Sequence, residues 1–154
     1  MIMMTTPSPT TTSDPRPRRA GLTEELRISI ARLSRRLRAQ GKSRLSVTQY
    51  AALAALVRHE SMTPRELADH EKVQPPSMTR VVAFLEAEGL AARMPHPTDR
   101  RQVLLTATDR GRELVREERK AKRAWLDVQL AKLTPEERAI LRQAAPILER
   151  ISQA

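Results

Sequence analysis

The chain has 154 residues and a formal net charge of +10, with 40% hydrophobic residues, 2% aromatic residues and no cysteine. This length fits one domain of ordinary size, and the strong positive charge indicates a polyanionic partner, either nucleic acid or an acidic membrane. Without cysteine the chain can form neither disulfides nor thiolate metal sites, and so few aromatic residues argue against a surface that stacks single-stranded bases.

The N-terminal residues 1–20 have the composition of a flexible tail, because they are rich in Thr, Ser, Pro and Arg. A helix is expected after this tail, from about Thr23 to Gln40, with Gly41 ending it. Its apolar side chains recur every three or four residues and so form one stripe, which consists of Leu22, Leu26, Ile30, Leu33 and Leu37.

Two capping boxes open the next two helices. Ser46 and Gln49 form the first box, and the segment after it, YAALAALVRH, is small and apolar on most sides, which is typical of a buried helix. Thr63 and Glu66 form the second box, with Pro64 in the first helical turn. A brief connection, KVQ, follows this short helix, so the pattern predicts a tight turn between two helices.

The second of these two helices is predicted within residues 74–89, QPPSMTRVVAFLEAEG. Its apolar face consists of Met78, Val81, Val82 and Leu85. Its opposite face is small, polar and basic, and consists of Pro76, Thr79, Arg80 and Ala83. Gly89 stands where a helix commonly ends with a left-handed residue. A helix with such an outer face can approach base edges in a major groove. Taken alone, however, the pattern favours an ordinary surface helix with one arginine, and only the segments that follow favour DNA binding.

After Gly89 the pattern changes to that of a β-hairpin. The residues Leu90–Met94 are expected to form the first strand, and Arg101–Thr106 are expected to form the return strand. The residues between them, 95–100, are dense in Pro, Asp and other turn formers. A hairpin with a charged tip that directly follows a helix-turn-helix is predicted to be a wing.

Two further helices are predicted after the hairpin. Thr108 caps the first of them, whose segment 116–123 is charged on all sides and is therefore expected to be solvated. Thr134 and Glu137 form a third capping box, which opens the last helix. Pro146 lies inside that helix and should kink it, because proline removes a backbone hydrogen bond.

The apolar stripes of the first helix and of the two last helices are more than a small winged-helix core can cover. Unpaired stripes of this kind are best buried against a second copy of the chain, so a homodimer is expected. The side chains expected in the dimer interface are Leu26, Leu33, Ile140, Ile147, Leu148 and Ile151.

From about Leu22 to its end, the chain resembles the MarR family of bacterial transcription regulators. Two stretches carry the resemblance, TPRELADHEKVQPPSMTRVVAFLEAEGL and PHPTDRRQVLLTATDRGREL, the second with an Asp-Arg-Arg triplet and a Thr-x-x-Gly helix opening. The resemblance implies a mainly α fold with a small β-hairpin wing, in one domain over residues 21–154. Within it, a winged helix-turn-helix over 45–107 is flanked by dimerisation helices over 21–40 and 108–152. It also implies a homodimer bound to a pseudo-palindromic operator in double-stranded DNA.

The resemblance also implies which residues contact DNA. Those that match the recognition helix are Pro76, Ser77, Thr79 and Arg80, and those that match the wing triplet are Asp99, Arg100 and Arg101. Arg101 matches an arginine that enters the minor groove, and Asp99 is expected to hold its guanidinium by a bidentate bond. Thr63 and Arg65 are candidate phosphate contacts. His96 departs from the family, because many relatives have an acidic residue at this position.

The sequence fits other classes of function less well than a regulator. His59, His70 and His96 lie on three different elements without metal-ligand spacing, so neither an enzyme nor a metal or cofactor site is expected. A nucleoid-coating architectural protein of the same fold would bind DNA by charge alone. A winged-helix module for protein–protein contact is a further alternative, which the basic wing disfavours. We expect a cytoplasmic, nucleoid-associated protein, because no apolar run reaches the ~18 residues that span a bilayer.

The favoured hypothesis is a sequence-specific regulator, a repressor released by a small molecule. The resemblance suggests a phenolic or other aromatic acid as this ligand, bound between the dimerisation helices and the winged core. Tyr50 and Trp125 are possible lining residues, but core packing is an equally good role for both.

Overall fold

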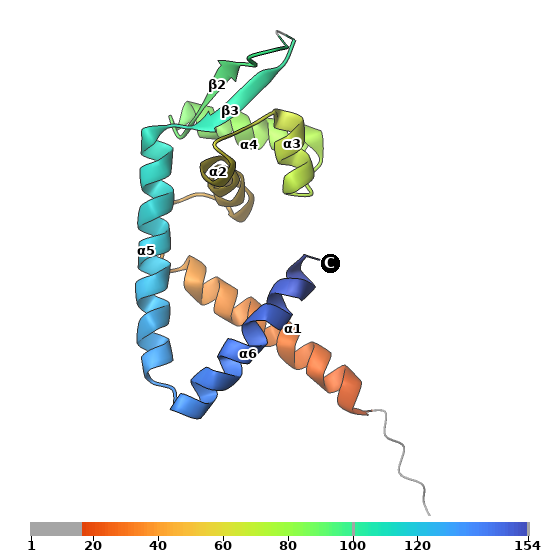
Figure 1. Cartoon of the computed structure of the whole chain (residues 1–154), viewed down its shortest axis with the longest axis vertical. Coiled ribbons are helices and arrows are strands. Elements are labelled where there is room, and N and C mark those ends of the chain that lie inside the picture. Colours follow the sequence, from red (N-terminus) through yellow and green to blue (C-terminus); the bar gives the residue numbers. More distant parts are fainter. Residues whose placement is uncertain (1–16, 100, 154) are drawn as a thin grey trace, which may run out of the picture. The chain divides into compact units, whose positions relative to one another are not determined.

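A computed structural model of the chain describes residues 17–99 and 101–153. Its elements follow the order α1, α2, β1, α3, α4, β2, β3, α5 and α6 (Figure 1). The chain divides into two compact units, residues 1–36 and 37–154, and each is described by itself. The fold class expected from the sequence, mainly α with a small β wing, is confirmed.

Helix α1 spans Pro17–Arg38 and therefore starts earlier than the expected Thr23. Residues 17–20, assigned to the tail from composition, are helical, while the rest of the predicted tail lies outside the described residues. Gly41 follows the end of the helix, close to the expected place, and its N–H donates to the carbonyl oxygen of Arg38 at 3.1 Å. Among the described glycines only Gly89 has a positive φ. Gly41 instead makes room for the carboxylate of Glu118, with which an added Cβ would collide.

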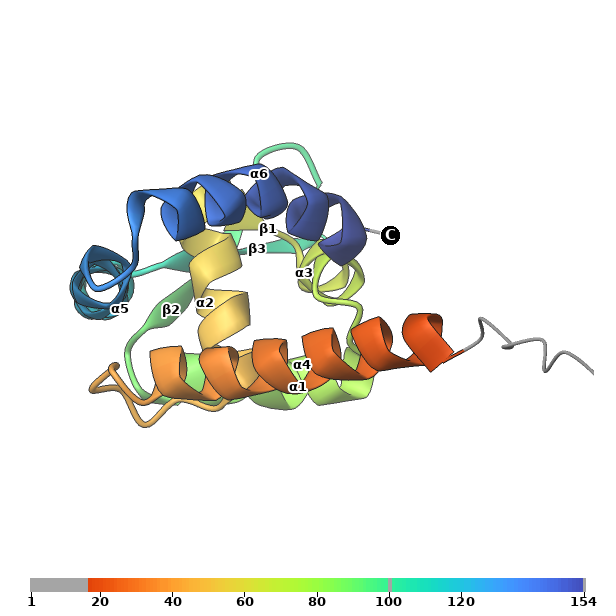
Figure 2. The same cartoon turned by 90° about the horizontal axis from the view of Figure 1, so that it is seen from below.

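Helix α2, Val47–His59, forms the centre of the larger unit. The capping box of Ser46 and Gln49 is present at its start, as predicted. Ala52, Leu53, Ala55 and Leu56 are buried, and α2 contacts α3, α4, α5, β1 and β3. Figure 2 shows α2 in the middle of this unit. The small apolar segment predicted to be a buried helix is therefore confirmed as the main part of the core.

The helix-turn-helix consists of α3, Pro64–His70, and α4, Pro75–Ala87. In the turn, Lys72 has a φ of 52°, and the N–H of Val73 donates to the carbonyl oxygen of Ala68 at 2.9 Å. Leu67 and Ala68 of α3 are buried in the same cluster as the apolar face of α4. Gly89 follows α4 with a φ of 67°, the left-handed conformation expected for it.

The wing is part of a three-stranded antiparallel sheet with the order β1-β3-β2. Strands β2, Ala91–Pro95, and β3, Val103–Ala107, form the predicted hairpin, which projects beyond α3 and α4 (Figure 1). Strand β1, Ser61–Met62, was not predicted, because two residues show no periodicity. Its place beside β3 is supported by the hydroxyl of Thr106, which donates to the carbonyl oxygen of Glu60 at 2.9 Å.

Helix α5, Asp109–Ala131, is capped by Thr108 as predicted, and α6, Pro135–Ser152, opens with the predicted capping box of Thr134 and Glu137. The hydroxyl of Thr108 accepts from the N–H of Gly111 at 3.1 Å and donates to the carbonyl oxygen of Gly89 at 2.7 Å. It thereby links the start of α5 to Gly89, which follows α4. No described helix is both long and apolar enough to cross a bilayer.

Candidate nucleic-acid interface

The two faces of α4 differ as the sequence predicted. Met78, Val82 and Leu85 are almost completely buried. The residues expected to contact DNA, Pro76, Ser77, Thr79 and Arg80, are all exposed. One helix therefore contributes three side chains to the core and presents a short, polar and basic surface to the solvent.

The N-terminal end of α4 has few free backbone donors. Pro75 and Pro76 have no N–H, and the amides of Ser77 and Met78 both donate to the carbonyl oxygen of Gln74, at 2.9 and 3.0 Å. Many helix N-termini bind phosphate through free amides. Because these are lacking here, only side chains offer donors to an anion at this end, and Arg80 is the cationic one on the exposed face.

The two candidate phosphate contacts, Thr63 and Arg65, differ in their exposure to solvent. Thr63 is only 9% exposed, and its N–H donates to the carboxylate of Glu66 at 2.7 Å. Its hydroxyl also bonds Glu66, so Thr63 caps α3 and does not present its side chain to DNA. The backbone N–H of Thr63, followed by its hydroxyl, lowers the pKa of Glu66. Arg65 is exposed and keeps its place as a phosphate candidate.

The wing turn is organised around Asp99, but not as the sequence suggested. One carboxylate oxygen accepts from the backbone N–H of Arg101 at 2.9 Å, and the other accepts from the side-chain amide of Gln102 at 3.0 Å. The expected bidentate bond to the Arg101 guanidinium is therefore wrong: Asp99 shapes the backbone of the turn and leaves the exposed Arg101 side chain available. Arg100 lies outside the described residues.

An ion pair joins the wing to the recognition helix. The Nε of Arg93, on β2, donates to the carboxylate of Glu86, on α4, at 2.8 Å. The pairing with Glu86 raises the pKa of Arg93. Both side chains are partly exposed, so the pair adds little stability, but it restricts the angle between the hairpin and α4. Helix α4 and strand β2 also pack directly against each other, so the ion pair supplements a contact that the backbone elements already make.

The charged segment 116–123 of α5 is not fully solvated, contrary to the prediction. Glu118 is 5% exposed and accepts from the backbone N–H of Ser43 at 2.7 Å. The Nζ of Lys122 lies 3.4 Å from the same carboxylate and 3.9 Å from the ring centre of Tyr50. Tyr50, a candidate ligand residue, is thus part of a link between α2, α5 and the loop before α2.

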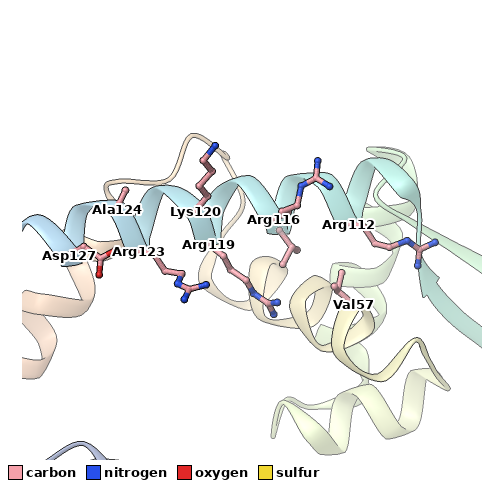
Figure 3. A pocket seen from close by; sticks show the side chains of 9 residues that line it. Val57, Arg112, Arg116, Arg119, Lys120, Arg123, Ala124 and Asp127 are labelled. Carbon is pink, nitrogen blue, oxygen red and sulfur yellow. The ribbon is translucent and has the colours of Figure 1, made fainter. Parts of the chain in front are cut away.

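A separate cavity of about 460 Å³ lies along α5 beside Val57 of α2 (Figure 3). Its lining is strongly basic and includes Arg112, Arg116, Arg119, Lys120 and Arg123, with Asp127 as the one acidic residue among those that line it. Figure 3 shows Lys120 on the opposite side of the helix from Arg119 and Arg123. Trp125, the other candidate ligand residue, is half-buried and does not line this cavity.

Two of the three histidines, His59 and His70, lie next to each other although they belong to different elements. The rings of His59 and His70 meet edge-to-face with 5.0 Å between their centres, and Nδ1 of His70 lies 3.1 Å from the carboxylate of Glu71. Over residues 17–99 and 101–153, no group of three or more histidine or acidic side chains could hold a metal ion.

Comparison with known proteins identifies the family. The sequence profile of the MarR family matches residues 45–103, which contain α2, both helices of the helix-turn-helix and the first strand of the wing, β2. An uncharacterized HTH-type transcriptional regulator of Mycobacterium bovis, Mb0904, is 45% identical over 130 residues, covering 84% of this chain and 91% of the relative. The HTH-type transcriptional repressor MdtR of Bacillus subtilis is 32% identical, covering 77% and 74%.

A solved structure agrees with these relatives. The Bordetella bronchiseptica protein BpsR, whose DNA binding is regulated by 6-hydroxynicotinic acid, superposes with a TM-score of 0.66 and 26% identity, covering 86% of this chain and 93% of that one. The comparisons support a regulator, and they do not support the architectural protein considered as an alternative. The chain belongs to the MarR family and is a DNA-binding transcriptional regulator.

Proposed function

We propose that the chain is a homodimeric repressor that binds a pseudo-palindromic operator and releases it when a small aromatic acid binds. The observation that supports operator binding most strongly is the exposed face of α4, with Arg80 on it, tied to the wing by the Glu86–Arg93 ion pair. A helix and a wing held together can contact a major groove and the adjacent minor groove at once. The repressor MdtR supports the direction of regulation.

Sequencing of genomic fragments retained by the purified protein tests this proposal. We expect a few strongly enriched sites that share an inverted repeat, because two copies related by a twofold axis bind two half-sites. The control is the same selection at higher salt, which weakens charge-driven binding to all fragments. Uniform retention of the genome at low salt, lost at higher salt without any enriched site, would instead favour a coating protein.

The case for a dimer comes from apolar side chains that a single chain leaves exposed. The exposed fractions are 64% for Ile140, 49% for Ile147, 40% for Leu148 and 62% for Ile151, and no residue of α6 is buried. On α1, taken by itself, Leu26 and Leu33 are exposed by 38% and 46%. Apolar stripes of this extent are normally covered in solution, which supports their proposed place in a dimer interface.

Leu148→Asp should weaken the dimer, because a carboxylate would be placed in an apolar interface without a partner. Sedimentation over a range of concentrations should show dissociation at a higher concentration than for the original protein. Ala145→Asp, at an exposed position of α6 away from the face that carries Ile140 and Ile147, is the control and should leave association unchanged. A stable folded monomer of the original protein at micromolar concentration would contradict the proposed dimer.

We place the proposed ligand in the basic cavity along α5. Arg119 and Arg123 offer cationic groups for a carboxylate, and Val57, on the same side of α5 in Figure 3, offers an apolar contact for a ring. The regulation of BpsR by an aromatic acid supports the ligand class. The measurement for this part of the proposal is displacement of operator DNA by an aromatic carboxylic acid such as salicylate.

A further inference from the structure

His96, at the start of the wing turn, uses its ring as a hydrogen-bond acceptor. Its Nδ1 lies 3.1 Å from the backbone nitrogen of Asp99 and 3.3 Å from that of Thr98. Backbone amides can only donate, so Nδ1 must be the unprotonated nitrogen of a neutral imidazole. The Thr98 hydroxyl also lies 3.3 Å from Nδ1 and adds a third polar contact.

These contacts are the first step of a chain that ends at Arg101. The His96 ring holds the backbone of Asp99, and the carboxylate of Asp99 holds the backbone N–H of Arg101 at 2.9 Å. The N–H of Gln102 donates to the carbonyl oxygen of Asp99 at 3.0 Å, which closes the turn. The place of the Arg101 side chain therefore depends on the backbone that His96 and Asp99 fix together.

We propose that His96 is a positioning residue for the wing arginine, and that operator binding requires its imidazole to be neutral. The inference rests on the proposed function in one respect, the contact of Arg101 with the minor groove. The titratable ring is what makes the effect depend on pH, since a carboxylate at this position could accept the same amides but would stay ionised at neutral and mildly acidic pH.

The expected effect of pH on the wing follows from the difference between the neutral and the protonated imidazole. A protonated imidazole carries a hydrogen on both ring nitrogens, so Nδ1 would then be a donor that faces two other donors. The turn must open or the ring must turn away, so Arg101 loses its position at low pH. Stabilisation of the wing is thus present while the ring is neutral and lost when falling pH protonates it.

Charged groups around His96 also affect a protonated ring. Glu66, on α3, interacts electrostatically with His96, and the Asp99 carboxylate lies in the same turn, so both attract a protonated ring. Arg101, also in the turn, repels it. A protonated wing is also more positive and would bind any DNA more tightly. Positioning and simple charge attraction therefore predict opposite effects of pH on operator binding.

The test compares the original protein with His96→Asn and His96→Ala. The amide oxygen of asparagine can accept the same backbone amides, but it does not titrate, so His96→Asn is the conservative control. Each protein is titrated with the recovered operator and with a scrambled duplex, at pH 5.5, 6.5 and 7.5 and one ionic strength. Because His59 and His70 are present in all three proteins, the difference between the variants isolates His96.

We expect operator affinity of the original protein to fall about three- to tenfold between pH 7.5 and 5.5, which corresponds to the loss of about one hydrogen bond. His96→Asn should keep the affinity measured at pH 7.5 throughout, and His96→Ala should be weak throughout. Equal pH profiles for the original protein and His96→Asn, or tighter operator binding at pH 5.5, would overturn the inference. Absence of any operator preference at pH 7.5 would instead contradict the proposed function.

A second measurement needs no DNA. The nitrogen chemical shifts of the His96 ring at pH 7.5 should show an unprotonated Nδ1, and the amide signals of Asp99 and Arg101 should move together as the ring titrates. In His96→Asn these two amides should not titrate over the same range. A ring protonated at Nδ1 at pH 7.5, or an Asp99 amide insensitive to the titration, would refute the positioning role even if operator binding is confirmed.

Discussion

Arg80→Ala should weaken operator binding by on the order of 1–3 kcal/mol, with a smaller loss on scrambled DNA. Arg80 is exposed on α4, on the face opposite to the buried Met78 and Val82. The amides at this end of the helix are already bonded or absent, so no backbone donor can replace its guanidinium. The measurement is a titration of both duplexes at one salt concentration.

The control is Arg138→Ala, which removes the same charge from an exposed position on α6. It should change both titrations only slightly, through the long-range attraction between protein and DNA. If Arg80→Ala weakens binding to both duplexes equally, Arg80 contacts phosphate alone. If neither variant changes binding, the exposed face of α4 is not the DNA surface.

Asp99→Ala, measured in the same titration, should also weaken operator binding, although it makes the protein more positive. The carboxylate of Asp99 fixes the wing backbone through Arg101 and Gln102. Attraction to phosphate alone predicts tighter binding for this variant. Tighter binding to both duplexes by Asp99→Ala would therefore show that the shape of the wing turn does not matter.

Gly111→Ala should destabilise the fold by on the order of 1–3 kcal/mol, the usual cost of overpacking. An added Cβ would collide with the backbone carbonyl oxygen of Leu90 and come within 3.1 Å of the Leu53 side chain. That carbonyl oxygen also accepts from the N–H of Thr108 at 3.0 Å, so it cannot move without disturbing the start of α5. Urea unfolding at one fixed protein concentration measures the change.

Gly21→Ala is the matched control for this prediction. Gly21 lies within α1, and an added Cβ would meet nothing within 4 Å. Alanine is the better helix former, so the free energy of unfolding should stay the same or rise slightly. A loss of stability for Gly21→Ala as large as for Gly111→Ala would show that the close approach to Leu90 is not the cause.

The sequence by itself determined where four of the helices begin and which face of α4 is buried. Ser46, Thr63, Thr108 and Thr134 all cap the helices that they were predicted to cap. These features could be predicted because a cap bonds an amide two or three residues away, and because the apolar face of a helix follows from its period. The hairpin and its place after α4 were also predictable, since strand period and turn residues are local signals.

The tertiary structure alone decided the partners of the charged and polar side chains. Glu118 stands in a segment charged on all sides, yet it is buried, because the amide of Ser43, 75 residues away in the chain, bonds its carboxylate. Strand β1 exists because Ser61 and Met62 pair with Thr106 and Leu105. Asp99 bonds the backbone of Arg101, and not its guanidinium, because His96 and Gln102 fix the shape of the turn. In each case the side chain or strand bonds a partner that is distant in the chain, or one of several donors that compete for the same atom. A local sequence pattern does not show which partner it will bond.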